Sequence, residues 1–387
     1  MRMLKHLLLP LILTFTLVGA GAGCATDAAV ISQAANMNTQ LEPAIVEDPE
    51  LASYLQQVGS RIIDVAEDLS AQGYGPSSHK GSDNKWMFGN NMKFHFVNSK
   101  TVNAFTTGGE HMYVYNALFQ MCKNEEELAA VMAHEYGHVY ARHVAKGMNR
   151  QYTALAAAAA LGGAGYVAGG KEHGAQYAAL GAGGGAALGQ FINMGFTRKD
   201  ENEADKLGFD FYTRAGWDPA LFGQFFQDMI DAGYDKTPAM MSDHPTLASR
   251  VESAKKWARE LPPNARQWRQ APVADGARFK QLQQRAMAVG KNMPDDTTLA
   301  NSQQLLQALP RSCIIPFTTQ DEVQAREAIA KRADAAQANA APAGAPGGSG
   351  AAAPQGAKKK KKRPQPAAAA PAAQRVPRQS QIIGRNG

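Results

Sequence analysis

Five consecutive residues, His134-Glu135-Tyr136-Gly137-His138, have the types and the spacing needed to bind a metal ion and use it. Residues four apart lie on one face of a helix, so His134 and His138 can direct their imidazole nitrogens at the same ion. Glu135 would then lie beside the open coordination position, where a carboxylate can act as general base on water. The pattern predicts one catalytic Zn²⁺ per chain, with His134 and His138 as ligands and Glu135 as the base.

A catalytic zinc ion needs a third protein ligand. His143 follows the second motif histidine by five residues, and helical geometry turns it away from the metal, so we interpret it as a packing residue. The acidic segment 198–205 is the better source. Glu201 and Asp205 are four apart, so one can bind zinc while the other orients a histidine, whereas Glu203 lies roughly 200° around the helix and should face away. We predict Glu201 as the third ligand and Asp205 as the carboxylate behind a histidine.

Local patterns place the motif on a helix that follows strands. Asn124 is a candidate N-cap, and Glu127 three residues later completes a capping box, so a helix is expected over residues 125–145. Aromatic and β-branched residues predict strands at 93–97 and 112–115, and the second could be an edge that pairs with an extended substrate. The fold class is therefore mainly α with a small β-sheet (α+β). Helical spacing also predicts helices within residues 27–75, 198–212, 222–229, 247–261, 279–287, 297–309 and 321–332.

The formal net charge of +6 comes from the C-terminal tail. Residues 335–387 hold five Lys, four Arg and no acidic residue, and without them and the two cations of the leader, 29 basic residues face 34 acidic ones. A nucleic-acid-binding domain carries its basic residues on the folded part, so that class is excluded. The tail is rich in Ala, Pro and Gly, cannot bury a core and is expected to be disordered. Its basic run 358–363 is either solvated or touches anionic envelope components.

The N-terminus predicts export. A positive start and an apolar run at residues 7–18 are typical of a signal peptide, which we place at 1–23. Cys24 follows small residues, as at the processing site of bacterial lipoproteins, where the thiol is acylated. Gly21 stands where that site usually has Leu, so cleavage after Ala22 by an ordinary signal peptidase is the alternative. We expect a periplasmic protein anchored through Cys24, with the outer membrane favoured because no Asp follows the cysteine.

Two structural questions stay open in the sequence. Cys122 and Cys313 form either one disulfide or two separate buried thiols. Residues 154–195 are mostly Ala and Gly, and they form either a pair of membrane-inserted helices or a helical hairpin packed on the domain. Glycine weakens helices and these side chains offer little apolar area, which favours the hairpin.

These motifs together resemble a known family. His-Glu-Tyr-Gly-His-Val-x-x-Arg-His at 134–143, Glu201-x-x-Ala-Asp-x-x-Gly, and His244-Pro245 followed by Arg250 are similar to the HtpX and CAAX prenyl endopeptidase type of zinc metallopeptidase. The soluble periplasmic branch, which includes BepA and LoiP, is the most similar. The resemblance covers about residues 48–257. It implies a gluzincin fold, with the ligands and base predicted above, and endoproteolysis of envelope proteins.

The resemblance also implies a role for His244. In BepA-like members the matching histidine can occupy the fourth zinc position and keep the enzyme inactive, so His244 is a candidate regulatory residue; alternatively it only caps or packs in its loop. A cationic or hydrogen-bonding group must stabilise the oxyanion during peptide hydrolysis, and Arg250 or His244 is the candidate.

We divide the chain into a signal peptide at 1–23, a zinc metallopeptidase domain at 24–275 with an Ala/Gly-rich insertion at 152–195, a helical extension at 276–334, and the tail at 335–387. The expected function is endoproteolysis of misfolded or misassembled envelope proteins, with protein substrates as partners, the membrane reached through the lipid anchor and no nucleic acid. A chaperone or assembly factor on the same scaffold is the alternative. An integral membrane protease is a third possibility, which rests on the Ala/Gly segment alone.

Overall fold

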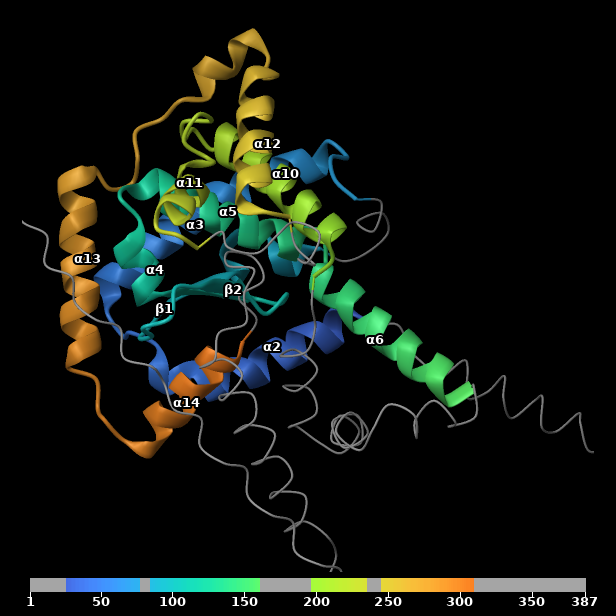
Figure 1. Cartoon of the computed structure of the whole chain (residues 1–387), viewed down its shortest axis with the longest axis vertical. Coiled ribbons are helices and arrows are strands. Elements are labelled where there is room, and N and C mark those ends of the chain that lie inside the picture. The colour runs from blue at the N-terminus through green and yellow to red at the C-terminus, as the bar shows by residue number, and fades with distance from the viewer. Residues whose placement is uncertain (1–25, 77–83, 161–195, 235–244, 310–387) are drawn as a thin grey trace, which may run out of the picture. The chain divides into compact units, whose positions relative to one another are not determined.

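The protein is described by a computed structural model that covers residues 26–76, 84–160, 196–234 and 245–309, with residues 154–160 described by their backbone alone. Helices surround a three-stranded sheet (Figure 1), which confirms the predicted fold class. The signal peptide, Cys24, most of the Ala/Gly segment, His244, Cys313, the helix expected at 321–332 and the basic tail lie outside these ranges. No helix in the covered part is long and apolar enough to cross a bilayer.

The sheet has the strand order β1-β3-β2, with β1 (Lys93–Val97) parallel to the central strand β3 (His111–Tyr115) and β2 (Ala104–Thr106) antiparallel to it. Both predicted strands are confirmed. The prediction that 112–115 forms an edge is wrong, because β3 is hydrogen-bonded on both sides. Three residues are too short to show strand periodicity, so β2 was missed. The outer strands of the described sheet are β1 and β2, and the end of β1 is covered by an antiparallel bridge between Ile45 and Val97.

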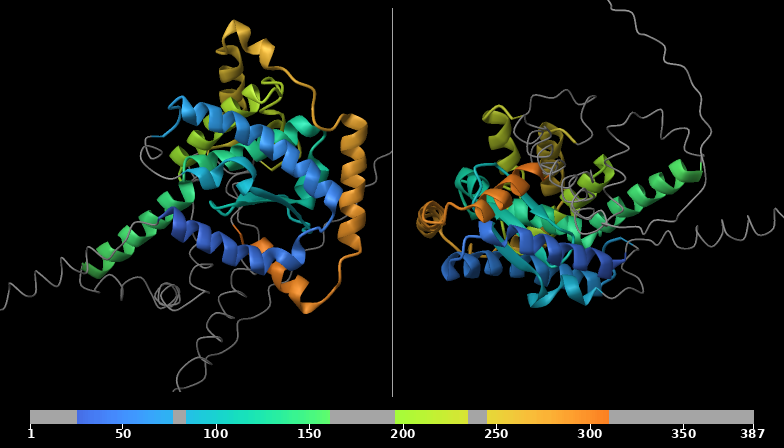
Figure 2. Two further views of the ribbon diagram at one scale, coloured as in Figure 1. Left: turned by 180° about the vertical axis from the view of Figure 1, so that it is seen from behind. Right: turned by 90° about the horizontal axis from the view of Figure 1, so that it is seen from below.

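Alternation along β3 directs its side chains to the two layers of helices. Met112 and Val114 pair with Phe94 and Phe96 on the face covered by α3 (Pro49–Ala71) and α5 (Glu125–Tyr140). On the other face, Tyr113 donates its hydroxyl hydrogen to Asn38 of α2 (Asp27–Leu41), and Tyr115 donates to the backbone of α14 (Thr297–Ala308). Figure 2 shows the sheet between these layers.

The expected helical stretch 27–75 is two helices. Proline cannot continue a helix interior, and Pro43 lies in a short 3₁₀ turn (Glu42–Ala44) that follows α2. A new helix, α3, begins at Pro49, where proline suits the first turn, and the side chain of Asp48 accepts from two backbone N–H groups as its cap.

The expected helix 125–145 ends earlier than predicted. The Asn124 side chain accepts from the backbone N–H of Glu127, as expected, although the Glu127 carboxylate reaches the N–H of Lys123 rather than closing the capping box. Helix α5 then ends at Tyr140, and α6 (His143–Ala160) begins after a break at Arg142, whose φ of 55° lies in the left-handed region. One residue in that conformation redirects the chain just after the metal-binding motif.

The remaining helices complete the core. They are α4 (Asn116–Met121), α10 (Arg198–Arg214), α11 (Gln224–Asp231), α12 (Leu247–Arg259) and α13 (Gly276–Lys291). Phe279 of α13 packs edge-on against Tyr54 and Phe119, and the Ser302 hydroxyl of α14 donates to the backbone of Gln40. Within the described residues, the predicted C-terminal extension is therefore continuous with the core of the preceding domain.

Candidate metal centre

Two glycines allow α5 and α10 to touch backbone to backbone. A Cβ atom on Gly137 would lie 2.7 Å from the carbonyl oxygen of Ala204, and one on Gly208 would lie 2.9 Å from the Cα of His134. Both distances are shorter than real Cβ contacts allow, so only glycine fits at these positions. The close approach brings the histidines of one helix against the carboxylates of the other.

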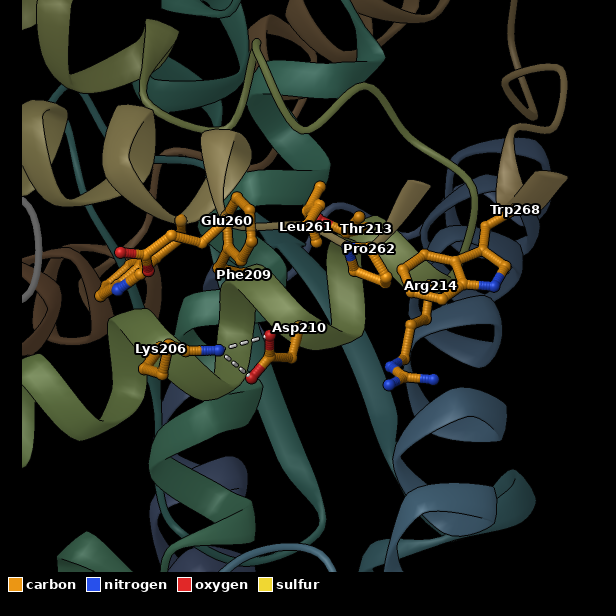
Figure 3. A pocket seen from close by; sticks show the side chains of 10 residues that line it. Lys206, Phe209, Asp210, Thr213, Arg214, Glu260, Leu261, Pro262 and Trp268 are labelled. Atoms are coloured by element: carbon orange, nitrogen blue, oxygen red, sulfur yellow. Dashed lines mark hydrogen bonds and ion pairs between the residues drawn. The ribbon is translucent and has the colours of Figure 1, made fainter. Parts of the chain in front are cut away.

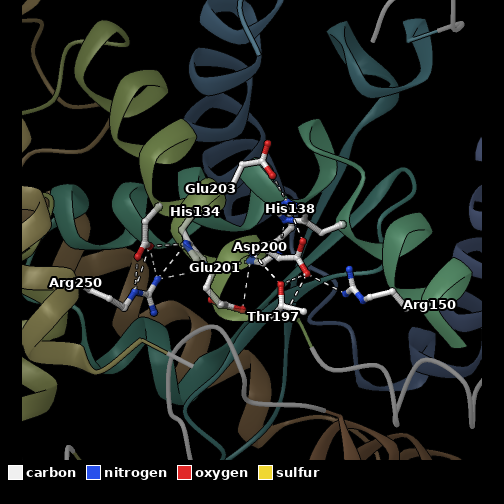
Figure 4. A network of polar contacts seen from close by, with 10 residues as sticks. His134, His138, Arg150, Thr197, Asp200, Glu201, Glu203 and Arg250 are labelled. Atoms are coloured by element: carbon white, nitrogen blue, oxygen red, sulfur yellow. Dashed lines mark hydrogen bonds and ion pairs between the residues drawn. The ribbon is translucent and has the colours of Figure 1, made fainter. Parts of the chain in front are cut away.

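The structure brings His134, His138 and Glu201 together (Figure 4). The two Nε2 atoms are 3.2 Å apart, and Glu201 has one carboxylate oxygen 3.5 Å from Nε2 of His134 and the other 3.8 Å from Nε2 of His138. All three side chains are buried. Ligands of a tetrahedral zinc ion at about 2.0–2.1 Å lie about 3.3 Å from one another, and two imidazoles with one carboxylate are a usual catalytic donor set. The geometry and the donor set fit a zinc ion.

Glu135 is fully buried on α5, between the two histidines in sequence. Since α5 is an unbroken helix through this turn, Glu135 directly follows the first ligand histidine on the same helix. The motif predicts this buried carboxylate as the proton acceptor at the metal site.

Asp205 lies behind His134. Its carboxylate lies 2.8 Å from Nδ1 of His134, so it can accept a hydrogen bond from that nitrogen and leave Nε2 free to bind a metal ion. Arg250 of α12 donates to both oxygens of Asp205, from Nε at 2.9 Å and from Nη2 at 2.6 Å, and lies over the ring of Phe226. Burial alone would raise the pKa of Asp205, but the charges and hydrogen bonds of Arg250 and His134 outweigh it and lower the pKa to about 2. Asp205 is therefore anionic at neutral pH.

The placement of Arg250 differs from the expected contact with an oxyanion. Its buried guanidinium is engaged with Asp205, and Nη2 is 3.0 Å from Nδ1 of His134. The contact that sequence reasoning missed is this link from α12 through Asp205 to a ligand histidine. An Arg at 250 carries no local signal of its partner 45 residues away.

His143 lies behind His138, which corrects the prediction that it turns well away from the metal face. Its Nδ1 is 3.0 Å from Nδ1 of His138, and its Nε2 is 3.1 Å from a carboxylate oxygen of Glu203. The break at Arg142 is the reason, because a continuous helix would have carried His143 around the axis. Glu203 does face away from the three ligands, as predicted, and the hydrogen bond from His143 lowers its pKa to about 2. Phe196 stacks on His138 at 4.1 Å between ring centres.

A pocket of about 270 Å³ lies on a different face of α10 from the ligand cluster (Figure 3). Lys206 and Asp210, which are ion-paired, line it together with Trp257 and Trp268. Its residues are distinct from those of the metal centre, so this pocket is not the predicted site.

Comparisons with known proteins agree with the geometry. Residues 85–258 match the family model described as "Peptidase family M48". The chain is 30% identical over 222 residues to the beta-barrel assembly-enhancing protease of Yersinia pestis, covering 57% of this chain and 41% of that protein. It is 31% identical over 169 residues to metalloprotease LoiP of Escherichia coli, covering 42% and 64%. It is 30% identical over 185 residues to the mitochondrial metalloendopeptidase OMA1 of Schizosaccharomyces pombe, covering 46% and 48%.

The chain thus spans about two fifths of the length of the beta-barrel assembly-enhancing proteases that it matches. The matched family region contains the ligand cluster, Glu135, Asp205 and Arg250. Since the motifs, the ligand geometry and the match to peptidase family M48 coincide in one segment, residues 85–258 confirm the predicted resemblance to this family of metallopeptidases.

Proposed function

We propose that the protein is a zinc-dependent endopeptidase of the bacterial envelope that hydrolyses peptide bonds in misfolded or misassembled proteins. The convergence of His134, His138 and Glu201 beside Glu135 carries the proposal. The names of the similar proteins, which are proteases and metalloendopeptidases, support it.

The proposed chemistry divides between the metal and the chain. A zinc ion held by His134, His138 and Glu201 would supply the Lewis acidity that polarises a peptide carbonyl and activates water near neutral pH. Glu135 takes the proton from the attacking water and then gives it to the leaving amine, so that the same carboxylate serves as base and acid.

Two further side chains support these steps in the proposal. Asp205, held by Arg250, keeps the ring of His134 in the tautomer that leaves Nε2 available as a ligand. His244 or Arg250 stabilises the developing oxyanion. Arg250 is already engaged by Asp205, and the variant His244→Ala separates the two roles of His244: slower cleavage would support this contact with the oxyanion, and faster cleavage the restraint described below.

The cellular setting is also a proposal. The export signal at 1–23 and the acylation of Cys24 would place the domain in the periplasm, anchored to the outer membrane, with protein substrates as its partners. The basic run 358–363 would add weak attraction to anionic envelope components.

His244 is proposed to restrain the enzyme by occupying the open coordination position until it is displaced. Pro245, where the described chain resumes, leads directly into α12, which carries Arg250. If the proposal is right, His244→Ala cleaves casein faster than wild type. Unchanged or abolished cleavage would remove the restraint from the account.

The alternative function is that of an envelope chaperone or assembly factor that uses the metallopeptidase fold as a scaffold. The two functions differ in their need for Glu135, since only proteolysis requires that carboxylate. Envelope defects rescued equally well by wild type and Glu135→Gln would favour the chaperone.

The decisive comparison is metal content and casein cleavage of wild type, Glu135→Gln and Glu252→Gln, the last an exposed glutamate on α12 as a matched control. We expect one zinc per chain in all three proteins and cleavage lost only in Glu135→Gln, by a factor of at least about 10². Full cleavage by Glu135→Gln would refute the assignment.

A further inference from the structure

Different side chains lie behind the two predicted ligand histidines. His134 donates from Nδ1 to an anionic carboxylate, that of Asp205, whereas His138 has the imidazole of His143 behind it. His143 is fully buried, and neither the motif nor the proposed chemistry gives it a task. We propose that His143 is a positioning residue for the metal centre: as a neutral acceptor held by Glu203, it fixes the tautomer and the ring orientation of His138. The inference rests on the proposed zinc site.

The direction of the hydrogen bonds follows from coordination. If zinc is bound at Nε2 of His138, the proton of that ring must be on Nδ1, which lies 3.0 Å from Nδ1 of His143. His143 can accept this hydrogen bond only if its own Nδ1 carries no proton. A neutral imidazole then carries its proton on Nε2, and that atom lies 3.1 Å from the Glu203 carboxylate, which accepts. Every nitrogen in the chain His138–His143–Glu203 therefore has one consistent role.

The backbone places His143 for this contact. The left-handed residue Arg142 turns the chain between α5 and α6, and its guanidinium makes a two-pronged ion pair with Asp27 at the start of α2. Phe196 stacks on His138 from another side. The ring of His138 is thus confined by packing, and its remaining freedom is set by the hydrogen bond to His143.

A second metal ion bound by His143, Asp200 and Glu203 is the competing explanation, since these three side chains also converge. Their charges argue against it. Lys146 lies 3.3 Å from the Glu203 carboxylate, and Arg150 lies 2.9 Å from that of Asp200. Asp200 also caps α10 through its reciprocal contacts with Thr197. Both carboxylates are therefore already neutralised by cations, and a divalent ion would have to displace them.

The experiment compares zinc binding by wild type, His143→Leu and His143→Asn in the full-length exported protein. Leucine removes the acceptor, so we expect the zinc dissociation constant, from competition with a chelator, to rise about 10- to 100-fold. Asparagine can place its amide oxygen near the position of Nδ1, so it should restore affinity to within a few-fold of wild type. Metal-free melting temperatures of the three proteins separate loss of folding from loss of zinc.

Two measurements keep the inference falsifiable if the leucine variant folds poorly. Long-range ¹H–¹⁵N spectra of the zinc-loaded wild type, assigned with the asparagine variant, should show His143 protonated at Nε2 alone; protonation at Nδ1 would overturn the inference. Zinc content should be one ion per chain, and two ions, with one lost in Glu203→Gln, would establish the second metal site instead.

The outcomes also separate this inference from the proposed function. Wild-type zinc affinity in His143→Leu would refute the positioning role and leave the protease proposal standing. Wild-type protein that binds no zinc would remove both.

Discussion

Replacing Gly208 with alanine is expected to weaken the metal centre without removing any ligand. The new Cβ would lie 2.9 Å from the Cα and the backbone nitrogen of His134, where ordinary van der Waals contact begins at 3.4 Å. These neighbours are backbone atoms, so α5 and α10 must separate by about 0.5 Å to accept the methyl group. That shift moves Glu201 away from both histidines, which lie on the other helix.

Two opposing effects set the magnitude. Overpacking costs about 1–3 kcal/mol, while alanine stabilises a helix interior relative to glycine by about 1 kcal/mol. The metal-free protein should therefore lose between about 0 and 2 kcal/mol of unfolding free energy. Zinc affinity has no compensating gain, because a ligand misplaced by half an ångström strains every bond in the site, and we expect at least a tenfold loss, about 1.4 kcal/mol.

The assay is chelator competition for zinc together with urea unfolding of the metal-free protein, on Gly208→Ala and on Gly276→Ala as a control. A Cβ at Gly276, the first residue of α13, meets no atom within 4 Å, so this variant should bind zinc as wild type does. Undiminished zinc affinity in Gly208→Ala, with a gain in stability, would show that the helices do not need their close approach.

Three further substitutions test the supports of the site and of the core. Arg250→Lys keeps the charge but loses the two-pronged contact with Asp205, so zinc affinity should fall about tenfold by chelator competition; an unchanged value would contradict the role given to Arg250. Glu125→Gln puts an amide N–H₂ among donors that include Trp217 and two backbone N–H groups, and should lower the urea-derived unfolding free energy by about 1.5–3 kcal/mol without changing zinc affinity. Burial raises the pKa of Glu127 to about 7 from 4.5, so its contribution to stability is present below pH 4.5 and is lost as the pH rises through 7; Glu127→Gln should therefore melt higher than wild type at pH 8 and equally near pH 4, and no gain at pH 8 would refute this.

Most of the site and of the fold that could be predicted came from patterns among residues that lie close together in the sequence. The spacing of His134 and His138 and that of Glu201 and Asp205 reflect the helix period, and the structure places each pair on one helical face as expected. The strand at 93–97 and the cap at Asn124 follow equally local rules.

Tertiary features account for what the sequence did not reveal. The left-handed Arg142 breaks a helix whose local composition would continue it, and this single residue decides where His143 lies. The central place of β3 depends on pairing with β2, a strand of three residues with no periodicity of its own. The closeness of α5 and α10 depends on Gly137 and Gly208, and neither residue signals in the sequence that it faces the other helix.

The central claim is that one zinc ion is held by His134, His138 and Glu201. Anomalous diffraction at the zinc absorption edge, from crystals of the purified protein, tests it most directly. The account predicts a single peak about 2.0–2.1 Å from Nε2 of both histidines and about 2.0–2.2 Å from the Glu201 carboxylate. A peak centred instead between His143, Asp200 and Glu203, or no peak at Glu201 in zinc-supplemented crystals, would contradict it.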